Sequence, residues 1–174
     1  MTSKKLVNFL LFVAGWWTAL LFGNAPALIA LFTVLMLHFV LWRDVRDIFL
    51  VLSFIFIGFG IEWAFMAADV HHYRTNLPPA WSICIWAMLA TVVRHFLSPV
   101  IKRPFFAAIL SAVAAPAFYC NSVYFAPLDW GRPVWQCLLV IALVWSLLAA
   151  FISGVLVPLL ESDTRGRQSV PESQ

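Results

Sequence analysis

The chain has 174 residues, of which 63% are hydrophobic and only 11% are charged, and its formal net charge is +3. A soluble domain carries about a quarter charged residues, because water must solvate its surface, so this composition excludes an ordinary soluble fold. The eleven Lys and Arg residues stand singly or in pairs between apolar runs, which argues against a nucleic-acid-binding surface. Composition therefore predicts an integral membrane protein.

Six apolar runs come close to or exceed the length of about 20 residues that a membrane-spanning helix needs. The breaks between them hold the glycines, prolines and charges typical of helix ends. We therefore predict an all-α polytopic membrane bundle of about six transmembrane helices, with a single domain over residues 1–160 and a disordered cytoplasmic tail over residues 161–174. In chain order, the expected helices cover residues 6–22, 26–42, 48–68, 80–97, 105–120 and 133–159.

The basic residues near the helix ends predict the orientation, because cytoplasmic loops are enriched in Lys and Arg. With the N-terminus inside, only Arg74 and Arg132 lie on the outer side. Both termini are therefore predicted to be cytoplasmic. The residues then expected on the cytoplasmic side are Lys4, Lys5, Arg43, Arg46, Arg94, Lys102, Arg103, Arg165 and Arg167.

Small side chains recur on two of the expected helices, 80–97 and 105–120. Ala108 with Ala112, and Ser111 with Ala115, are pairs of small residues one turn apart. Such pairs allow the backbone of another helix to approach closely. We therefore expect these two helices to pack together.

Glu62 stands within the apolar run 48–68, where an ionised side chain is costly and is a functional candidate by default. Asp69 follows two helical turns later on the same face, and Asn121 stands at the same expected membrane side. These three residues are candidates for lining one binding cavity. Two interpretations of Glu62 stay open, namely a proton-carrying, ligand-binding or catalytic carboxyl group, and a structural one hydrogen-bonded to a later helix.

A second polar group is expected toward the cytoplasmic side, where His38, Arg94 and His95 fall at similar depths in their helices. Together they could bind an anion such as a lipid phosphate. The alternative is that Arg94 extends along its helix so that its guanidinium reaches the interface.

Metal and cofactor chemistry finds little support in the sequence. Asp69, His71 and His72 are weak candidates for a zinc site, but a solvated loop is the favoured interpretation, and we expect no metal centre and no cofactor. The chain has no GxSxG, Walker, HExxH or dinucleotide-binding motif. This absence favours a non-enzymatic role.

A family resemblance rests on the following stretches: Asn8-Phe9-Leu10, Gly15-Trp16, residues 38–44, residues 78–81, Trp86, Ala90-Thr91, His95 and residues 114–119. Together they resemble a family of small bacterial inner-membrane proteins named domain of unknown function 2878. The resemblance implies a multi-pass protein of the bacterial inner membrane with no established activity. Members are often encoded beside enzymes resembling cyclopropane-fatty-acid synthases, which implies a supporting role in membrane lipid modification. The family pattern often has Asp at position 62 and glycines at positions 114 and 115.

Three functional hypotheses follow. The first is an accessory or binding protein in membrane lipid modification, whose partners are membrane lipid, a second membrane protein or a second copy of the chain. The second is a small proton-coupled transporter or permease that uses Glu62 and Asp69. The third is an intramembrane enzyme that uses His71, His72 or Glu62. Nucleic acid is not an expected partner.

Overall fold

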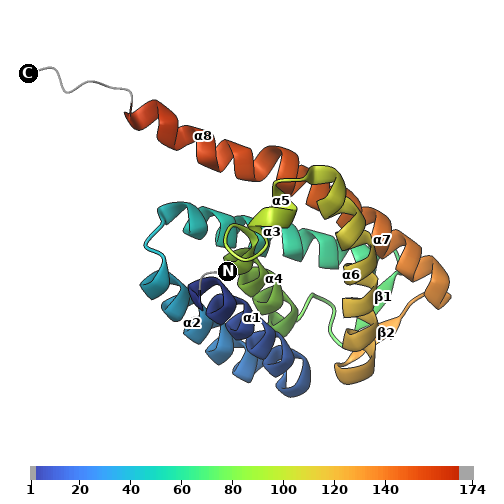
Figure 1. Ribbon diagram of the computed structural model, residues 1–174. Coiled ribbons are helices and arrows are strands. Elements are labelled where there is room, and N and C mark those ends of the chain that lie inside the picture. Colours follow the sequence, from blue (N-terminus) through green and yellow to red (C-terminus); the bar gives the residue numbers. More distant parts are fainter. Residues whose placement is uncertain (1–2, 169–174) are drawn as a thin grey trace, which may run out of the picture.

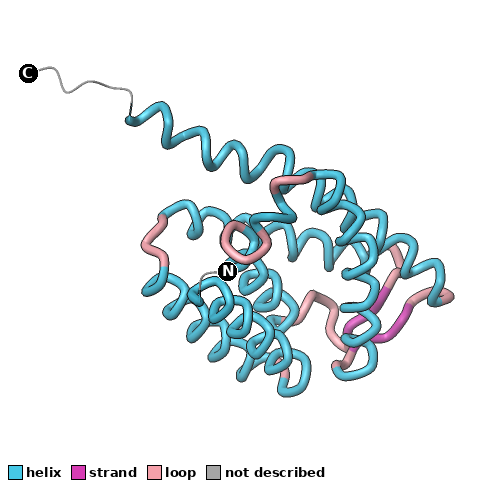
Figure 2. Tube along the Cα trace, in the orientation of Figure 1, coloured by secondary structure: helices cyan, strands magenta, loops and turns pink. Residues whose placement is uncertain are grey.

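A computed structural model describes residues 3–168, with side chains described as far as Ser162. The fold is helical apart from one two-stranded sheet (Figures 1 and 2), so the predicted all-α bundle is confirmed in its main architecture. Among the described residues, five helical stretches are long and apolar enough to cross a membrane. They are α1 (Ser3–Phe22), α2 (Asn24–Leu41), α3 (Val45–Ala67), α6 (Pro104–Phe125) and the stretch Val134–Ser162. This last stretch contains α7 (Val134–Phe151), a π-helical segment η1 (Ile152–Leu156) and the first half of α8 (Val157–Gln168).

The remaining apolar helix, α4 (Ala80–Val93), has only 14 residues, shorter than the expected 80–97. After Val93 the backbone turns, and the N–H of Leu97 donates to the carbonyl of Val92 over 2.9 Å. The short helix α5 (Ser98–Ile101) follows, with Pro99 in its first turn, where the missing N–H of proline costs no hydrogen bond. Ten of the 14 residues of α4 are buried, so α4 is the central helix of its group.

The helices form two packed groups. In the first, α4 packs against α1, α2 and α3, and in the second α6 packs along α7 (Figure 1). The expected packing of residues 80–97 against 105–120 is therefore wrong, because α4 is enclosed by the first three helices and α6 takes α7 as its partner. The space between the two groups holds the cavity described below.

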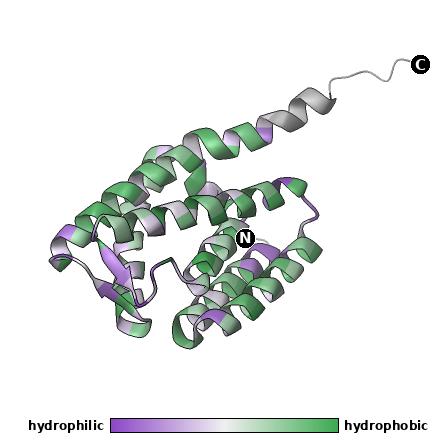
Figure 3. Cartoon of the chain, turned by 180° about the vertical axis from the view of Figure 1, so that it is seen from behind, coloured by the Kyte–Doolittle hydropathy of each residue, from purple (hydrophilic) through white to green (hydrophobic). Residues whose placement is uncertain are grey.

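The helices consist mostly of hydrophobic residues (Figure 3), and many of the exposed side chains are large and apolar. Ile29, Phe56 and Val113, from three different helices, are exposed by 69%, 76% and 70% of their surface. A monomeric soluble protein rarely exposes large continuous apolar patches. Hydrocarbon is the solvent that suits this surface, which supports a multi-pass membrane protein.

A small sheet links the connection after α3 to the connection after α6 (Figure 2). Strand β1 (His71–Tyr73) pairs antiparallel with β2 (Leu128–Trp130), and Tyr73 lies opposite Leu128. Because successive side chains of a strand point to opposite faces, His71 and Tyr73 are buried while His72 is exposed. The interpretation of this segment as a solvated loop is therefore wrong for His71.

Two further segments differ from the expectations. Helix α6 continues past residue 120 to Phe125, and within it the side chains of Asn121 and Ser122 donate to the carbonyls of Ala117 and Phe118 over 2.9 and 3.0 Å. The backbone of α8 continues as a helix to Gln168, within the segment for which we expected a disordered tail. Residues 169–174 of that segment lie outside the described residues.

One pair of glycines offers a test of how tightly α3 and α4 are packed. A Cβ atom at Gly58 would overlap the indole of Trp86, whereas one at Gly60 would meet no atom within 4 Å. The Trp86 ring cannot easily move away, because it stacks on Trp145 at a centroid distance of 4.6 Å. We expect Gly58→Ala to lower the free energy of unfolding by about 1–3 kcal/mol, the usual range for overpacking a core.

The matched control for this prediction is Gly60→Ala on the same helix, which is expected to be neutral or slightly stabilising because Ala favours helix. Unfolding in mixed detergent micelles, followed by tryptophan fluorescence, gives both values. Equal stabilities for the two variants would show that α3 and α4 do not approach as closely as described.

Candidate functional site

Helix α3 carries two buried acidic residues, Asp47 in its first turn and Glu62 near its other end. Fifteen residues separate them, which corresponds to about 22 Å along a helix with a rise of 1.5 Å per residue. Each is the centre of a polar cluster. We call these the Glu62 cluster (Glu62, His71, Tyr73, Ser82, Trp86 and Tyr119) and the Asp47 cluster (Asn8, His38, Asp44, Asp47, Arg94 and His95).

In the Glu62 cluster, three side chains donate hydrogen bonds to one carboxyl group that is only 3% exposed. Oε1 accepts from Trp86 Nε1 at 2.8 Å and from Tyr119 Oη at 2.7 Å. Oε2 accepts from Tyr73 Oη at 2.8 Å. An ionised carboxylate only accepts hydrogen bonds, so a ring of three donors from three different elements suits it.

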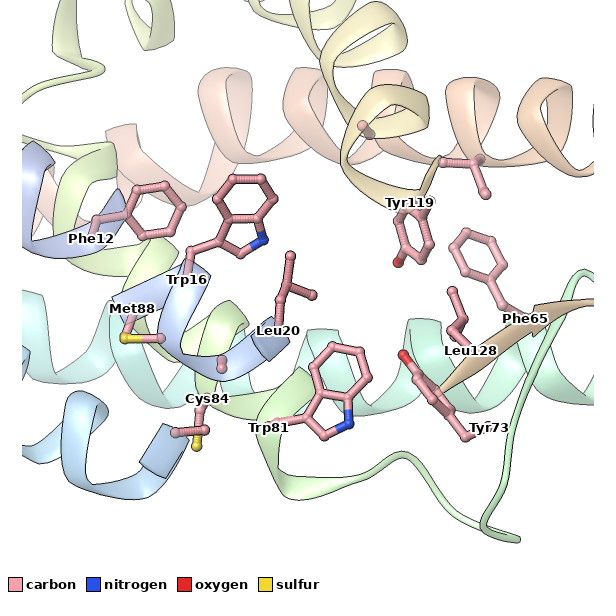
Figure 4. Packing of buried hydrophobic residues seen from close by; sticks show 14 of the residues in the cluster. Phe12, Trp16, Leu20, Phe65, Tyr73, Trp81, Cys84, Met88, Tyr119 and Leu128 are labelled. Carbon is pink, nitrogen blue, oxygen red and sulfur yellow. The ribbon is translucent and has the colours of Figure 1, made fainter. Parts of the chain in front are cut away.

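The hydroxyl of Tyr73 also lies 3.0 Å from Ser82 Oγ. Tyr73 has one proton, and if it is donated to Glu62, the Ser82 hydroxyl donates in turn to Tyr73. Burial raises the pKa of Tyr73 well above its ordinary value, and the negative charge of Glu62 raises it further, so Tyr73 stays a neutral donor. The hydroxyls of Tyr73 and Tyr119 point toward the same space, between α4, α6 and β1 (Figure 4).

His71 completes this cluster and is fully buried. Its Nε2 lies 3.1 Å from Glu62 Oε2, at ion-pair distance, although the ring is not aligned for a hydrogen bond. Its Nδ1 has no hydrogen-bond partner within residues 3–162. The ring packs edge-on against Phe65 and Tyr73, which holds it in place.

The Glu62 cluster lies at one wall of an apolar cavity of about 240 Å³ between the two helix groups. Aromatic side chains from α1 and α4 form one side, and α6 and α7 form the other. Leu110 and Phe118 line the cavity and are also 42% and 40% exposed, so the cavity reaches the outer surface of the bundle along α6. The indole nitrogen of Trp145, another lining residue, is buried without a hydrogen-bond partner in the described part of the chain. The polar or amphipathic residues of the lining include Glu62, Tyr73, Ser82, Ser111, Tyr119 and Ser122.

In the Asp47 cluster, a single carboxyl group holds three cationic or potentially cationic side chains. Asp47 Oδ1 accepts from Arg94 Nη1 at 2.5 Å, and Oδ2 lies 3.0 Å from His38 Nε2 and 2.9 Å from His95 Nε2. Arg94 Nη2 also donates to Asp44 over 3.1 Å. The hydrogen bonds from Arg46, together with the charge of Arg94, lower the pKa of the Asp44 carboxyl to about 2. Since Arg94 is only 9% exposed, it forms a buried ion pair instead of extending to the interface.

The structure brings some of the expected site residues together and separates others. His38, Arg94 and His95 meet, as expected, but around an acidic residue that leaves no room for a simple anion site. Asp69 is bonded to the exposed His72 at 2.5 Å, on the other side of the strand from His71. Asp69 and Asn121 do not line the cavity that Glu62 lines.

Sequence reasoning did not identify Asp47, Tyr73, Trp86 or Tyr119 as site residues, although Trp86 and Tyr119 belong to the stretches that carry the family resemblance. A buried Tyr or Trp needs a hydrogen-bond partner for its polar atom. This requirement is the property of the sequence that could have linked the aromatic residues to Glu62. The sequence predicts Asp47 in the break before the expected helix 48–68. In the structure α3 begins at Val45, so Asp47 lies in its first turn. Acidic residues are common in the first turn of a helix for reasons of the helix dipole, so Asp47 carried no distinctive signal.

Comparison with known proteins gives one result. Residues 5–151 match the family described as Protein of unknown function (DUF2878). The chain belongs to this family. The DUF2878 match contains every residue of both clusters, from Asn8 to Tyr119. No curated protein and no solved structure matches the chain significantly, so neither offers an activity to compare.

Proposed function

We propose that this DUF2878 protein binds an amphipathic lipid molecule in the cavity between its two helix groups. The apolar chain of the ligand lies along the aromatic walls, and its polar group lies beside the Glu62 cluster. The observation that carries the proposal is an apolar cavity that reaches the lipid-facing surface along α6 and has the Glu62 cluster at one wall. A ligand pocket of this type is mostly apolar, with a few polar groups that orient the ligand.

The size of the cavity limits the ligand. Its volume of about 240 Å³ is somewhat below the range of about 300–1,000 Å³ for pockets that enclose drug-sized ligands. A single hydrocarbon chain with a small polar group fits this space, whereas a complete two-chain phospholipid does not. Other parts of a larger lipid would stay in the bilayer beside Leu110 and Phe118.

The charge of the Glu62 cluster limits the polar group. An ionised Glu62 repels phosphate and carboxylate groups and favours a hydroxyl or amine. The Ser82 hydroxyl and the unpartnered indole N–H of Trp145 are both in the lining and offer hydrogen bonds to such a group. A protein of this kind would present one lipid chain to a partner enzyme, which is the accessory role in lipid modification that the family resemblance implies.

Filling the cavity tests the proposal. Ala114 lines the cavity on α6, and Ala114→Phe adds a ring there. We expect lipid retained by the purified protein, measured by mass spectrometry of extracts after detergent exchange, to fall about tenfold, because about 1.4 kcal/mol of overpacking corresponds to that factor.

The matched control is Val113→Phe, at the neighbouring position, which is 70% exposed on the outer surface of the same helix. This variant is expected to retain lipid as the wild type does. Equal retention by both variants, or a wild type that never retains a defined lipid, would rule out this cavity as the binding site.

We also propose that the protein lies in the bacterial inner membrane with both termini cytoplasmic. Support comes from α4, whose first turn is near Asn24 and whose end is near Asp47. The N–H of Trp81 donates to Asn24 Oδ1 over 3.0 Å, and Arg94 binds Asp47. These contacts lie at opposite ends of the first helix group and support α4 as the sixth crossing of the proposed topology.

Reporter fusions test this topology. Alkaline phosphatase and green fluorescent protein fused after residue 174 should be inactive and fluorescent, respectively, as expected for a cytoplasmic end. The same reporters inserted after Asn76, in the connection between β1 and α4, should give the opposite result. A phosphatase-active C-terminus would contradict the six-crossing topology.

A further inference from the structure

The hydrogen bonds of Asn8 determine which nitrogen of His38 carries a proton. Asn8 Nδ2 donates to the backbone carbonyl of Thr91 over 2.8 Å. A carbonyl oxygen can only accept, so the amide cannot be turned around, and Asn8 Oδ1 must face His38 Nδ1, 3.1 Å away. Because that oxygen also only accepts, His38 Nδ1 is the protonated nitrogen.

A neutral His38 then presents the lone pair of Nε2 to Asp47 Oδ2 at 3.0 Å. Two lone pairs at this distance repel each other unless a positive charge lies between them. His95 Nε2 approaches the same oxygen at 2.9 Å from a different segment, and the three ligand atoms all lie within 4.8 Å of one another. His38 is fully buried and Asp47 nearly so, which keeps water from separating the groups.

We propose that His38, Asp47 and His95 bind one divalent first-row transition metal ion, such as Zn²⁺ or Fe²⁺. Two imidazoles and one carboxylate are a ligand set that both ions accept, with further positions left for water or another ligand. For bonds of about 2.0–2.2 Å, neighbouring ligands of an octahedral ion lie about 3 Å apart, whereas those of a tetrahedral ion lie about 3.3–3.6 Å apart. The distances of 3.0 and 2.9 Å from Asp47 Oδ2 to the two imidazole nitrogens agree with the octahedral spacing.

The surroundings of the three residues are those of a metal site. Ligating histidines usually donate their other N–H to a fixed acceptor, and ligating carboxylates are themselves hydrogen-bonded. Asn8 performs the first role for His38, and Arg94 performs the second at Asp47 Oδ1. The ring of His95 stacks on Trp42 at a centroid distance of 4.3 Å, which fixes its orientation.

The three ligands come from three separate parts of the fold, which makes the site a property of the folded chain. His38 is in the last turn of α2, Asp47 is in the first turn of α3, and His95 follows α4. His95 is 13% exposed, and Asp44, which binds the adjacent residue Arg94, is 25% exposed, so an ion can enter from this end of the bundle.

A direct loading experiment tests the proposal. Full-length protein in detergent, with its purification tag removed, is stripped with a chelator and then titrated with Zn²⁺ or Co²⁺. We expect about one bound ion per chain by plasma mass spectrometry, a rise in thermal midpoint, and visible absorption bands from bound Co²⁺. The metal content of protein that is purified anaerobically and not stripped then shows whether the natural ion is zinc or iron.

The test variant is His95→Gln, which removes a ligand at the more exposed edge of the cluster, and it should lose stoichiometric binding. The matched control is His72→Gln, an exposed histidine outside the cluster, which should bind as the wild type does. Asn8→Ala should bind about 10–100-fold more weakly, because it removes the partner that orients His38.

The wild type alone can overturn the proposal, even if a variant does not fold. Failure of the stripped wild type to take up Zn²⁺ or Co²⁺ would do so. Nitrogen-15 spectra of zinc-treated protein with both nitrogens of His38 protonated would assign the positive charge to a proton and would equally exclude the metal. Unchanged binding in folded His95→Gln would exclude this ligand set.

Discussion

Glu62→Leu is expected to lower the free energy of unfolding by about 3–5 kcal/mol, the range for removing one partner of a buried charged network. The substitution leaves the Trp86 N–H and the hydroxyls of Tyr73 and Tyr119 facing an apolar side chain. Each buried donor left without an acceptor costs about 1–3 kcal/mol, although part is recovered where a hydroxyl can turn. Unfolding in mixed detergent micelles measures the loss.

Glu62→Gln tests whether the cluster needs the negative charge of a carboxylate or only a side chain of the same shape. The amide oxygen can still accept from Trp86 and Tyr119, while the amide NH₂ group replaces the oxygen that accepts from Tyr73. Tyr73 can then turn its hydroxyl toward Ser82, 3.0 Å away, and accept from the amide. We therefore expect Glu62→Gln to cost about half as much as Glu62→Leu.

The matched control is Asp129→Asn, which neutralises an exposed acidic residue on β2. A surface change of this kind should stay within about 0.5 kcal/mol of the wild type. If Glu62→Leu were also neutral, the three donors would not depend on the carboxylate, and the cluster as described would be wrong.

The same geometry separates the functional hypotheses for Glu62. A proton-carrying carboxyl group must change its hydrogen-bond partners during transport, and Glu62 is held by three donors from α4, α6 and β1. Asp69, the second acidic residue of the transporter hypothesis, is outside the cavity and bonded to His72. Glu62 therefore fits a fixed wall of a binding cavity better than it fits a proton carrier.

Hydropathy alone predicted the helices that face lipid, because their exposed surfaces are uniformly apolar. It could not predict that α4 is enclosed by its neighbours, since a buried helix and a lipid-facing helix have the same composition. The strands β1 and β2 have three residues each, and their paired residues, His71 with Trp130 and Tyr73 with Leu128, are far apart in the sequence. Three residues are too few to show the alternation of apolar and polar side chains that predicts a strand. The two segments meet only because the helices around them fold.

The two polar clusters differ in how far the sequence could predict them. Glu62 was identifiable because a charge within an apolar run is unusual. The convergence of His38, Arg94 and His95 followed from their similar depths in the expected helices. The group that joins them, Asp47, was not identifiable, because a polar residue at a helix boundary is ordinary and only the start of α3 at Val45 brings it into the bundle.

The second large effect is expected at Arg94. Arg94→Met removes the guanidinium that binds Asp47 and Asp44, and it leaves the buried Asp47 carboxylate hydrogen-bonded only to two imidazoles among the described side chains. Breaking a buried ion pair by removing one partner costs about 3–5 kcal/mol. Unfolding in detergent micelles with a chelator present measures the loss of stability from the broken ion pair without any contribution from bound metal.

A double-mutant cycle identifies Asp47 as the cause of that loss. In Arg94→Met combined with Asp47→Asn, the uncompensated carboxylate is gone, so the double variant should lose at least about 1.5 kcal/mol less than the sum of the single losses. The control is Arg74→Met, which removes an exposed guanidinium in the connection after β1 and should be nearly neutral. Additive losses for Arg94 and Asp47 would mean that the two side chains do not interact. In that case the convergence of His38 and His95 on the Asp47 carboxylate would not be fixed by an ion pair with Arg94.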